Sequence, residues 1–469
     1  MAESAPAAPL WTAEEIVAAT GGVLMGQAFN AHGVETDSRA LEAGDLFVAL
    51  SAARDGHDFV PQALAHGAAG SLVSKASPEP CIKVDDTLRA LGRLGEAARR
   101  RAIGARRGAV TGSVGKTSVT QAVLAGLNLA GHGHGSVKSF NNHIGVPLTL
   151  ARMPADTRRA VFEIGMNHAG EITPLSRLVR PHAVAITNVE AVHVENFPDG
   201  EAGVAEAKAE ILAGIEPGGV AVLNGDNRWF ESLSGAARAA GAEVRAFGQG
   251  EACAARLIDF QPGAEGARIE AEVEGRRIAF PIRQMARHWG PMSLATLLML
   301  RALEVDFDTA LAALSAFEPL AGRGAARDVA LGSGVFTLID ESYNASPISV
   351  ASALAALSAR ATSGRRIAAL TDMLELGPDS ADRHAALAPV IAQAGIDLIF
   401  CAGPLMKSLY DALEPGRRGA WTVEAEALIP RLAEAIEPGD TVMVKGSKAS
   451  RASQIAAALI AGAATGVTA

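Results

Sequence analysis

The sequence of 469 residues predicts an α/β protein of three domains. Single hydrophobic cores stop growing beyond roughly 250–300 residues, so a chain of this length is expected to divide. Short apolar segments alternate with amphipathic helical segments, which is typical of mainly parallel sheets covered by helices on both faces. Hydrophobic residues make up 49% and charged residues 20% of the chain, a balance that excludes disordered and collagen-like proteins.

Residues 1–84 are predicted to form a small α/β domain. Two of its segments have helical periodicity, and three are short apolar runs bounded by turn residues, as expected of strands. The helical segments are 12–20 and 58–66, and the strands are 44–50, 70–74 and 81–84. A long amphipathic helix over 85–103 follows, and its basic end suits the negative pole of a helix dipole.

Residues 85–318 are predicted to form a central domain around a mainly parallel sheet. Its strands are expected at 108–111, 160–164, 183–187, 219–224 and 244–247, with the clearest helices between them at 116–130 and 201–212. Between 257 and 282 the pattern changes to short strands that turn at Glu274-Gly275, which predicts an antiparallel hairpin at the sheet edge. Two helices, over 285–303 and 308–317, complete this domain.

Residues 319–469 are predicted to form a C-terminal, Rossmann-like doubly wound domain. Residues 319–322, Pro-Leu-Ala-Gly, are interpreted as the linker that precedes it. Beyond the linker, strands and helices alternate again, which indicates a second open parallel sheet. The strands are expected at 335–340, 366–370, 398–402 and 441–445, and the helices at 349–360, 381–394 and 424–436.

Composition also limits the partners and the compartment of the chain. A net charge of −9 and an aromatic content of 4% argue against a general nucleic-acid-binding protein. The three cysteines, Cys81, Cys253 and Cys401, lie far apart, which predicts buried thiols in a reducing compartment. No secretory signal is recognised, and the longest apolar runs are shorter than the roughly 18 residues of a membrane span. We therefore expect a cytoplasmic protein without membrane insertion, and by default a monomer.

The strongest chemical signal is a glycine-rich loop between a predicted strand and a predicted helix. Residues 109–118 read Ala-Val-Thr-Gly-Ser-Val-Gly-Lys-Thr-Ser. In such a loop, glycines let backbone N–H groups approach phosphates, the lysine neutralises the β- and γ-phosphates, and the hydroxyl reaches Mg²⁺. The loop is a variant, because Val110 stands where the first glycine is usual. The sequence predicts an ATP or GTP site at Gly112, Ser113, Val114, Gly115, Lys116, Thr117 and Ser118.

Phosphoryl transfer also needs carboxylates near the ends of neighbouring strands, where they hold metal ions. Glu163 ends an apolar strand, and burying it without a cation is costly, which favours a metal ligand over a solvated glutamate at a sheet edge. His193 lies in the loop after the next strand, and Lys208 lies on the following helix. From spacing alone, a solvated loop histidine and an exposed helical lysine remain the simpler interpretations of these two residues.

Polar clusters also follow the strands of the C-terminal domain. The carboxyl ends of strands are where open α/β sheets bind ligands, so these clusters are candidate parts of a site. They are Gly322-Arg323-Gly324 at the linker and the segments 340–347, 372–377 and 445–448.

Together these segments resemble the Mur ligase family, over nearly the whole chain. The resemblance rests on segments 36–39, 44–50, 55–59, 111–117, 141–149, 163–168, 340–347, 372–377 and 445–447. All Mur ligases and folylpolyglutamate synthase share the phosphate loop. The strings Asn-Asn-His-Ile-Gly-Val-Pro (141–147), Gly-Met-Asn-His (165–168) and Met-Leu-Glu-Leu-Gly (373–377) are more specific, and are similar to the family members that add D-alanyl-D-alanine.

The resemblance implies an ATP-dependent carboxylate–amine ligase with Mg²⁺ as cofactor. Its substrates would be UDP-N-acetylmuramoyl-tripeptide and D-alanyl-D-alanine, joined through an acyl phosphate with release of ADP and phosphate. This step belongs to peptidoglycan synthesis, and so to cell-wall growth, cell shape and division. Whether lysine or diaminopimelate occupies the third peptide position is left open.

The resemblance also implies a role for individual residues. Lys116 and the loop amides would hold the ATP phosphates, Arg323 would reach the γ-phosphate when the domains close, and Asp340 would contact the ribose. One magnesium would be held by Thr117 and Glu163, and a second by His193 and Lys208, with Lys208 carbamylated. The catalytic set would be Lys116, Glu163, His193, Lys208 and Arg323. Ser38, Arg39 and Asn142 would face the UDP-sugar substrate and the first domain would bind it.

Two departures from the family pattern leave alternatives open. Met292 stands where the family carries an asparagine of the adenine pocket, and Glu341 and Ser346 stand where Asp and Asn are commoner. One alternative is a sister ligase that adds a different amino acid. The other is a nucleotide-dependent binding or regulatory protein without catalysis, against which the intact residues Lys116 and Glu163 argue.

Overall fold

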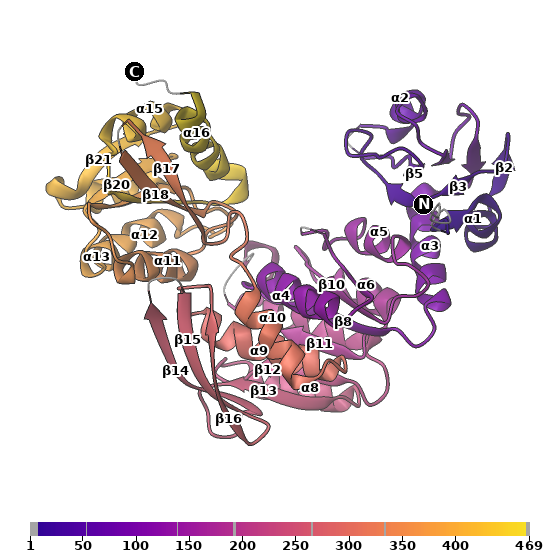
Figure 1. The fold of residues 1–469 in the computed structure, drawn as a ribbon, viewed down its shortest axis with the longest axis horizontal. Coiled ribbons are helices and arrows are strands. Elements are labelled where there is room, and N and C mark those ends of the chain that lie inside the picture. Colours follow the sequence, from indigo (N-terminus) through magenta and orange to yellow (C-terminus); the bar gives the residue numbers. More distant parts are fainter. Residues whose placement is uncertain are drawn as a thin grey trace, which may run out of the picture.

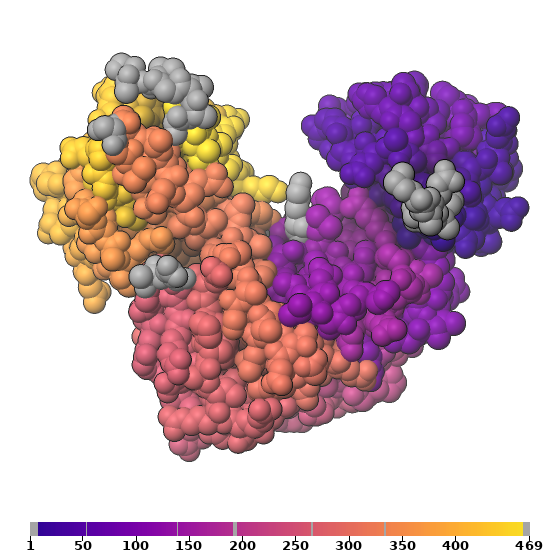
Figure 2. All heavy atoms as spheres, in the orientation of Figure 1, coloured from indigo at the N-terminus to yellow at the C-terminus, as the bar shows by residue number. Residues whose placement is uncertain are grey.

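The computed structural model describes residues 8–52, 54–137, 139–190, 194–263, 266–332 and 334–465. The predicted α/β fold is confirmed, with three large sheets that follow one another along the chain (Figure 1). The N-terminal and C-terminal parts both rest on the central part, and an open cleft separates them (Figure 2). The domain boundaries after residues 84 and 318 stay predictions.

The N-terminal part is built on a five-stranded sheet in the order β2-β7-β6-β5-β4. Its strands are β2 (Val23–Met25), β4 (Gly33–Glu35), β5 (Asp45–Val48), β6 (Gly70–Val73) and β7 (Cys81–Lys83); β2 alone runs antiparallel. Short strands β1 (Trp11–Thr12) and β3 (Asn30–Ala31) pair separately. The helices are α1 (Ala13–Thr20), the turn η1 (Gly56–Phe59) and α2 (Val60–Ala65). Thr12 caps α1 with its side chain, as a helix start requires.

The N-terminal part is docked on the central part through a shared hydrophobic core. Helix α3 (Thr87–Arg101) packs against α5 (Gly145–Ala151), and one apolar cluster continues across both. The Trp11 indole N–H donates to the Ala151 carbonyl at 2.8 Å. Arg152, which follows α5, pairs with the buried Glu35 carboxylate at 2.7 Å. Ion pairs desolvated in this way fix orientation, so the two parts are expected to move together.

The central part contains a nine-stranded sheet in the order β16-β15-β14-β13-β12-β11-β8-β10-β9. The parallel strands are β8 (Arg106–Thr111), β9 (Gly133–Gly135), β10 (Arg159–Glu163), β11 (Ala183–Ile186), β12 (Val220–Asn224) and β13 (Glu243–Gly248). Strand β14 (Ala255–Gly263) continues them, and β15 (Gly266–Val273) and β16 (Arg276–Ile282) extend the edge in antiparallel pairs. The predicted hairpin is confirmed, because Glu274 and Gly275 both adopt the positive φ of a two-residue turn.

Helices cover both faces of this sheet, as predicted. One face carries α4 (Lys116–Leu129), α9 (Trp289–Ala302) and α10 (Phe307–Ala316). The other carries α3, α5, α6 (Ile172–Val179), α7 (Glu201–Ala209) and α8 (Phe230–Ala239). The turn η3 (Glu210–Gly214) continues α7, and η2 (Val194–Asn196) precedes it. Neighbouring residues Ala109 and Val110 of β8 enter opposite cores, which is why the strand is apolar throughout.

The C-terminal part contains a six-stranded sheet in the order β17-β18-β22-β19-β20-β21. Strands β18 (Gly334–Glu341), β19 (Arg366–Thr371), β20 (Leu398–Ala402), β21 (Arg418–Thr422) and β22 (Thr441–Lys445) are parallel, and β17 (Ala325–Leu331) is an antiparallel edge. One face carries α11 (Pro347–Ala359), α12 (Ser380–Ala385), α13 (Leu387–Gln393) and α14 (Met406–Ala412); the other carries α15 (Ala425–Ala435) and α16 (Ala452–Thr465). Short turns η4 (Pro415–Arg417) and η5 (Lys448–Ser450) complete it.

Three sequence-based expectations differ from the structure. The helix predicted over 381–394 is two helices, α12 and α13, which meet at Ala386. Strand β17 was not predicted, because its two polar residues, Arg327 and Asp328, are adjacent and give no apolar–polar alternation along the segment. Cys81 and Cys401 are buried as expected, but Cys253 is only partly buried. Within the described residues, no helix is long and apolar enough to cross a bilayer.

Candidate active site

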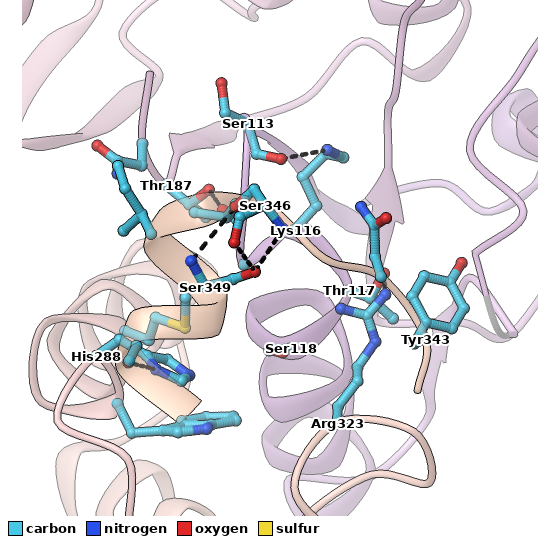
Figure 3. A pocket seen from close by; sticks show the side chains of 18 of the residues that line it. Ser113, Lys116, Thr117, Ser118, Thr187, His288, Arg323, Tyr343, Ser346 and Ser349 are labelled. Carbon is cyan, nitrogen blue, oxygen red and sulfur yellow. Dashed lines mark hydrogen bonds between the residues drawn. The ribbon is translucent and has the colours of Figure 1, made fainter. Parts of the chain in front are cut away.

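A cavity of about 410 Å³ lies between the central and C-terminal parts. Its walls come from the loop between β8 and α4, the ends of β10 to β13, and the start of α9 (Figure 3). The C-terminal part adds the turn before β17, the segment from the end of β18 into α11, and the end of β22. The structure therefore brings together groups that lie more than 300 residues apart in sequence. The predicted site residues that line it are Ser113, Val114, Gly115, Lys116, Thr117, Ser118, Glu163 and Arg323.

The glycine-rich loop has the backbone of a phosphate-binding loop. Gly112 and Gly115 adopt φ values of 151° and 85°, which residues with a Cβ rarely reach. A Cβ at Gly112 would also collide with the Thr187 hydroxyl. The Ser113 N–H donates to the Asn188 carbonyl at 2.8 Å, so the loop is held against the segment that follows β11.

Lys116 lies half-buried at this loop. Its Nζ donates to the Gly112 carbonyl at 2.6 Å and to the Ser113 carbonyl at 3.3 Å. Burial lowers the pKa of Lys116, and the nearby Glu163 carboxylate partly opposes that effect. Neutral carbonyls compensate a positive charge only in part, so an anion at the loop gains a strong partner here.

Glu163 is buried at the carboxyl end of β10, which has neighbours on both sides. Its Oε1 accepts a hydrogen bond from the Asn141 amide at 2.7 Å. Its Oε2 is buried and has no hydrogen-bond partner within the described residues. The interpretation as a solvated glutamate at a sheet edge is therefore wrong. A buried carboxylate oxygen without a donor is a costly arrangement unless a cation binds there.

Lys208 is 3% exposed on α7, so its interpretation as a surface lysine is wrong. Burial holds its pKa well below the usual 10.5, and the charge of Lys116 lowers it further. It makes no hydrogen bond or ion pair with any residue that the structure describes, and it does not line the cavity itself. Burial of this kind favours the uncharged amine over the protonated one. His193, which the resemblance predicted to bind the same metal ion as Lys208, lies outside the described residues.

Arg323 crosses from the C-terminal side of the cavity to the phosphate loop. Its Nη2 donates to the Thr117 hydroxyl at 2.9 Å, and Thr117 also contacts the Ser139 hydroxyl at 2.8 Å. A second bridge joins the same parts, because the His288 ring of the central part contacts the Ser352 hydroxyl of α11 at 3.0 Å. The cavity is thus closed on the side of α9 and α11.

Other predicted residues lie outside this cavity. Both carboxylate oxygens of Asp340 accept hydrogen bonds from the protein itself: Oδ1 accepts from the Ser342 N–H and hydroxyl, and Oδ2 accepts from the Gly322 N–H of the linker at 3.0 Å. Glu341, the next residue, lines the cavity instead. Ser38 and Arg39 belong to the N-terminal part, and the exposed Arg39 guanidinium lowers the pKa of Asp37 to about 2. The Asn142 side chain caps α5 by accepting from the Gly145 N–H at 2.9 Å.

Several cavity residues were not predicted from the sequence. Glu190 follows β11, and burial raises the pKa of its carboxyl group. Tyr343 and Asn344 lie in a segment that was singled out, although neither was given a role. Polarity directly after an apolar strand is the signal they share with Glu163. Met292, the departure from the family pattern, lines the cavity and packs against Gly115 of the phosphate loop.

Residues 372 and 373 of the predicted polar cluster at 372–377 form hydrogen bonds within the protein. The Asp372 carboxylate accepts from the Met406 N–H at 2.8 Å. The buried His384 accepts from the Met373 N–H at 3.0 Å, so its ring is neutral, and burial lowers its pKa. These bonds hold the ends of β19 and β20 together.

Comparison with known protein families matches three successive segments of the chain. Residues 30–99 match the "Mur ligase family, catalytic domain", residues 110–300 the "Mur ligase middle domain", and residues 329–448 the "Mur ligase, glutamate ligase domain". The chain belongs to the Mur ligase family. The resemblance inferred from the motifs is thereby confirmed.

Individual relatives match over almost their whole lengths. The UDP-N-acetylmuramoyl-tripeptide–D-alanyl-D-alanine ligase of Bacillus subtilis is 33% identical and covers 92% of this chain and 93% of its own. The ligase of the same name from Escherichia coli is 32% identical, with 96% and 98% covered. Among solved structures, a ligase from Acinetobacter baumannii matches with a TM-score of 0.83 and 26% identity, covering 98% and 100%. MurF of Thermotoga maritima, solved with ADP, shares the fold with a TM-score of 0.75 and 22% identity, covering 93% and 98%.

Proposed function

We propose that this Mur ligase joins D-alanyl-D-alanine to UDP-N-acetylmuramoyl-tripeptide at the expense of ATP, which forms the pentapeptide precursor of peptidoglycan. The observation that carries the proposal is the phosphate loop faced by Arg323 from another part of the chain. Relatives with that activity in their names match more than nine-tenths of this chain, which supports the same substrates here.

In the proposed reaction, the terminal carboxylate of the tripeptide attacks the γ-phosphate of ATP and gives an acyl phosphate and ADP. The amine of the dipeptide then attacks the acyl carbon, loses a proton and expels phosphate. Lys116 would exchange the Gly112 and Ser113 carbonyls for phosphate oxygens. Arg323 would offset the charge of the transferred phosphoryl group, and closure around the cavity would exclude water that hydrolyses an acyl phosphate.

The donors at the phosphate loop fit a bound Mg²⁺. Glu163 offers a buried carboxylate oxygen without a partner, and Thr117 offers a hydroxyl at the start of α4. Within the described residues, no three His, Cys, Asp or Glu side chains form a metal site on their own. Mg²⁺ in nucleotide sites usually takes one or two protein ligands and completes its shell with phosphates and water. When bound, the ion would neutralise charge on the phosphates.

Lys208 is the residue that we propose to be carbamylated. A neutral amine adds to CO₂ and releases a proton, and the product is an anionic carbamate with oxygen atoms that suit a second Mg²⁺, together with His193. The lowered pKa of Lys208 supports this role, because only the unprotonated amine reacts. The test is carbon NMR of protein equilibrated with ¹³C-bicarbonate. A carbamate signal that is absent from the Lys208→Met variant is expected, and an unlabelled lysine in the wild type would refute the modification.

The UDP-sugar end of the substrate is proposed to bind the N-terminal part, across the cleft in Figure 2. Arg39 is exposed there and carries the positive charge that a diphosphate requires. Ser38 and Asn142 are proposed to contact the same substrate. In this arrangement the peptide would extend from the N-terminal part toward the phosphate loop.

The deciding experiment measures phosphate release from ATP with UDP-N-acetylmuramoyl-tripeptide, with and without D-alanyl-D-alanine. Release that requires both substrates, with the pentapeptide product identified by mass, is expected. Release with glutamate or another amino acid in place of the dipeptide would assign the chain to a sister ligase. Binding of ATP without release under any condition would mean a nucleotide-binding protein that lacks catalysis.

A further inference from the structure

The backbone around Arg323 is tied to the segment that follows β18. The Tyr343 N–H donates to the Gly322 carbonyl at 3.1 Å, and the Gly324 N–H donates to the Asp340 carbonyl at 2.8 Å. Gly322 and Gly324 adopt φ values of 73° and 98°, so the chain turns sharply on both sides of the arginine. The base of the Arg323 side chain is therefore placed by residues 340–343.

The far end of the same side chain lies on an aromatic ring. The Arg323 Cζ is 3.9 Å from the centroid of the Tyr343 ring, well inside the ~6 Å range of a cation–π contact. Figure 3 shows the Arg323 guanidinium beside both the Thr117 side chain and this ring. The Tyr343 hydroxyl makes no hydrogen bond within the described residues, so the contact uses the face of the ring.

Arg323 has no carboxylate partner among the residues that the structure describes. The nearby Glu341 carboxylate pairs with Lys445 at 3.2 Å instead. The guanidinium has five N–H donors, and the described contacts use one of them, toward Thr117. Most of its hydrogen-bonding capacity thus remains free at the phosphate loop, while the ring limits where the group can move.

We propose that Tyr343 is a positioning residue, which holds Arg323 over the phosphate loop through the face of its ring. The inference rests on the proposed function, in which Arg323 meets the transferred phosphoryl group. A donor that is already in place stabilises the transition state without reorganisation. Loss of the ring lets the arginine sample other rotamers, so the turnover number falls while ATP is still held by the loop.

The test compares two substitutions of Tyr343 in the full-length enzyme with both substrates. Tyr343→Phe keeps the ring and is expected to retain kcat within about twofold of wild type. Tyr343→Leu removes the ring and is expected to lower kcat on the order of tenfold, with little change in KM for ATP. Tyr343→Met takes its place if the leucine variant does not fold. The control is Tyr410→Leu, which removes the ring under Arg418 outside the cavity and leaves kcat unchanged.

A double-mutant cycle separates positioning from a structural role. Because Tyr343 acts through Arg323, the Tyr343→Leu substitution is expected to cause no further loss in an Arg323→Ala background. Equal losses in both backgrounds would overturn the proposal, as would full activity of Tyr343→Leu or an equally impaired Tyr343→Phe. Absence of turnover in the wild type would instead count against the proposed function.

Discussion

Lys116 of the phosphate loop lies within electrostatic reach of two other basic side chains, Lys208 and Arg323. None of them forms an ion pair with a carboxylate among the described residues, and burial lowers the pKa of both lysines. Protonated groups in such a place repel one another and lack solvation, so the site is electrostatically unfavourable until an anion enters. Bound ATP would relieve part of this cost by adding phosphate charge, and the proposed carbamylation of Lys208 would relieve another part by converting that amine to an anion.

Replacing Lys116 with alanine is expected to lower kcat by roughly 10²–10³-fold, the range for removing one strong charge-stabilising donor. The fold should persist, since the side chain bonds only to loop carbonyls. Phosphate release with both substrates measures the loss. Lys407→Ala is the matched control, because Lys407 pairs with Asp411 on the exposed side of α14. Near-normal turnover of Lys116→Ala would remove Lys116 from the mechanism.

Gly112→Ala is expected to abolish ATP binding while Gly218→Ala retains it. Both glycines adopt positive φ, which strains any residue with a Cβ. At Gly112 the new methyl group also meets the Thr187 hydroxyl, whereas at Gly218 it enters open space. Calorimetric titration with ATP and Mg²⁺ distinguishes the two. Equal affinities would show that the loop relaxes to accommodate the methyl group.

At the level of elements, the carboxyl and amino ends of the central strands carry different groups of polar residues. The carboxyl ends of β8 and β10 supply the phosphate loop and Glu163, as expected for open α/β sheets. The amino ends of β8 and β11 carry a buried charge cluster, in which the Arg107 N–H donates to His182 and the Arg107 guanidinium contacts Glu216. The Arg107 guanidinium also donates to the Val179 carbonyl, so this cluster ties the amino end of β8 to the segment before β11.

His182 makes the stability of this edge depend on pH. Burial, with the charge of Arg107 second, lowers its pKa from 6.5 to about 4. Between these values the unfolded chain binds the proton and the folded chain does not, so stability is lost as the pH falls through 6.5 toward 4. His182→Gln removes this dependence. The wild type should lose roughly 1–2 kcal/mol more than the variant between pH 7.5 and 5. Parallel melting curves at the two pH values would contradict the assignment.

In the whole molecule, the hydrophobic clusters define two bodies of unequal size. One apolar cluster joins the N-terminal part to one face of the central sheet, whereas the C-terminal sheet has two clusters of its own. Polar bridges such as Arg323 to Thr117 connect the C-terminal part to the rest. Two bodies with few shared apolar contacts are free to move as units, which is the usual basis of domain closure.

Scanning calorimetry of the full chain is expected to resolve two transitions. One belongs to the N-terminal and central parts together, and the other belongs to the C-terminal part. ATP with Mg²⁺ should raise both melting temperatures and bring them closer, since the cavity is lined by both bodies and binding to the folded state stabilises each. Three separate transitions, or a nucleotide effect confined to one of them, would contradict this division.

Much of this description could be predicted from the amino-acid sequence, because its signals are local. The phosphate loop needs only a strand, a few glycines and a helix in succession, and β20 and β22 begin and end at the predicted residues. The motifs also identified the family, since they contain the polar residues that follow the strands and are expected to contact the substrates. Periodicity and turn residues are sufficient wherever a segment is apolar and bounded by breakers.

Other features follow from packing between distant segments. Glu163 and Lys208 are not solvated, because other elements cover them. Glu341 lines the cavity and Asp340 does not, because the Asp340 oxygens bond to Ser342 and to Gly322 of the linker. The ring of Tyr343 reaches Arg323 because β17 and β18 pair in antiparallel fashion and bring the residues before β17 next to those after β18. Burial and the direction of a side chain depend on neighbours far away in sequence, and these determine the charge state and the reach of each group in the site.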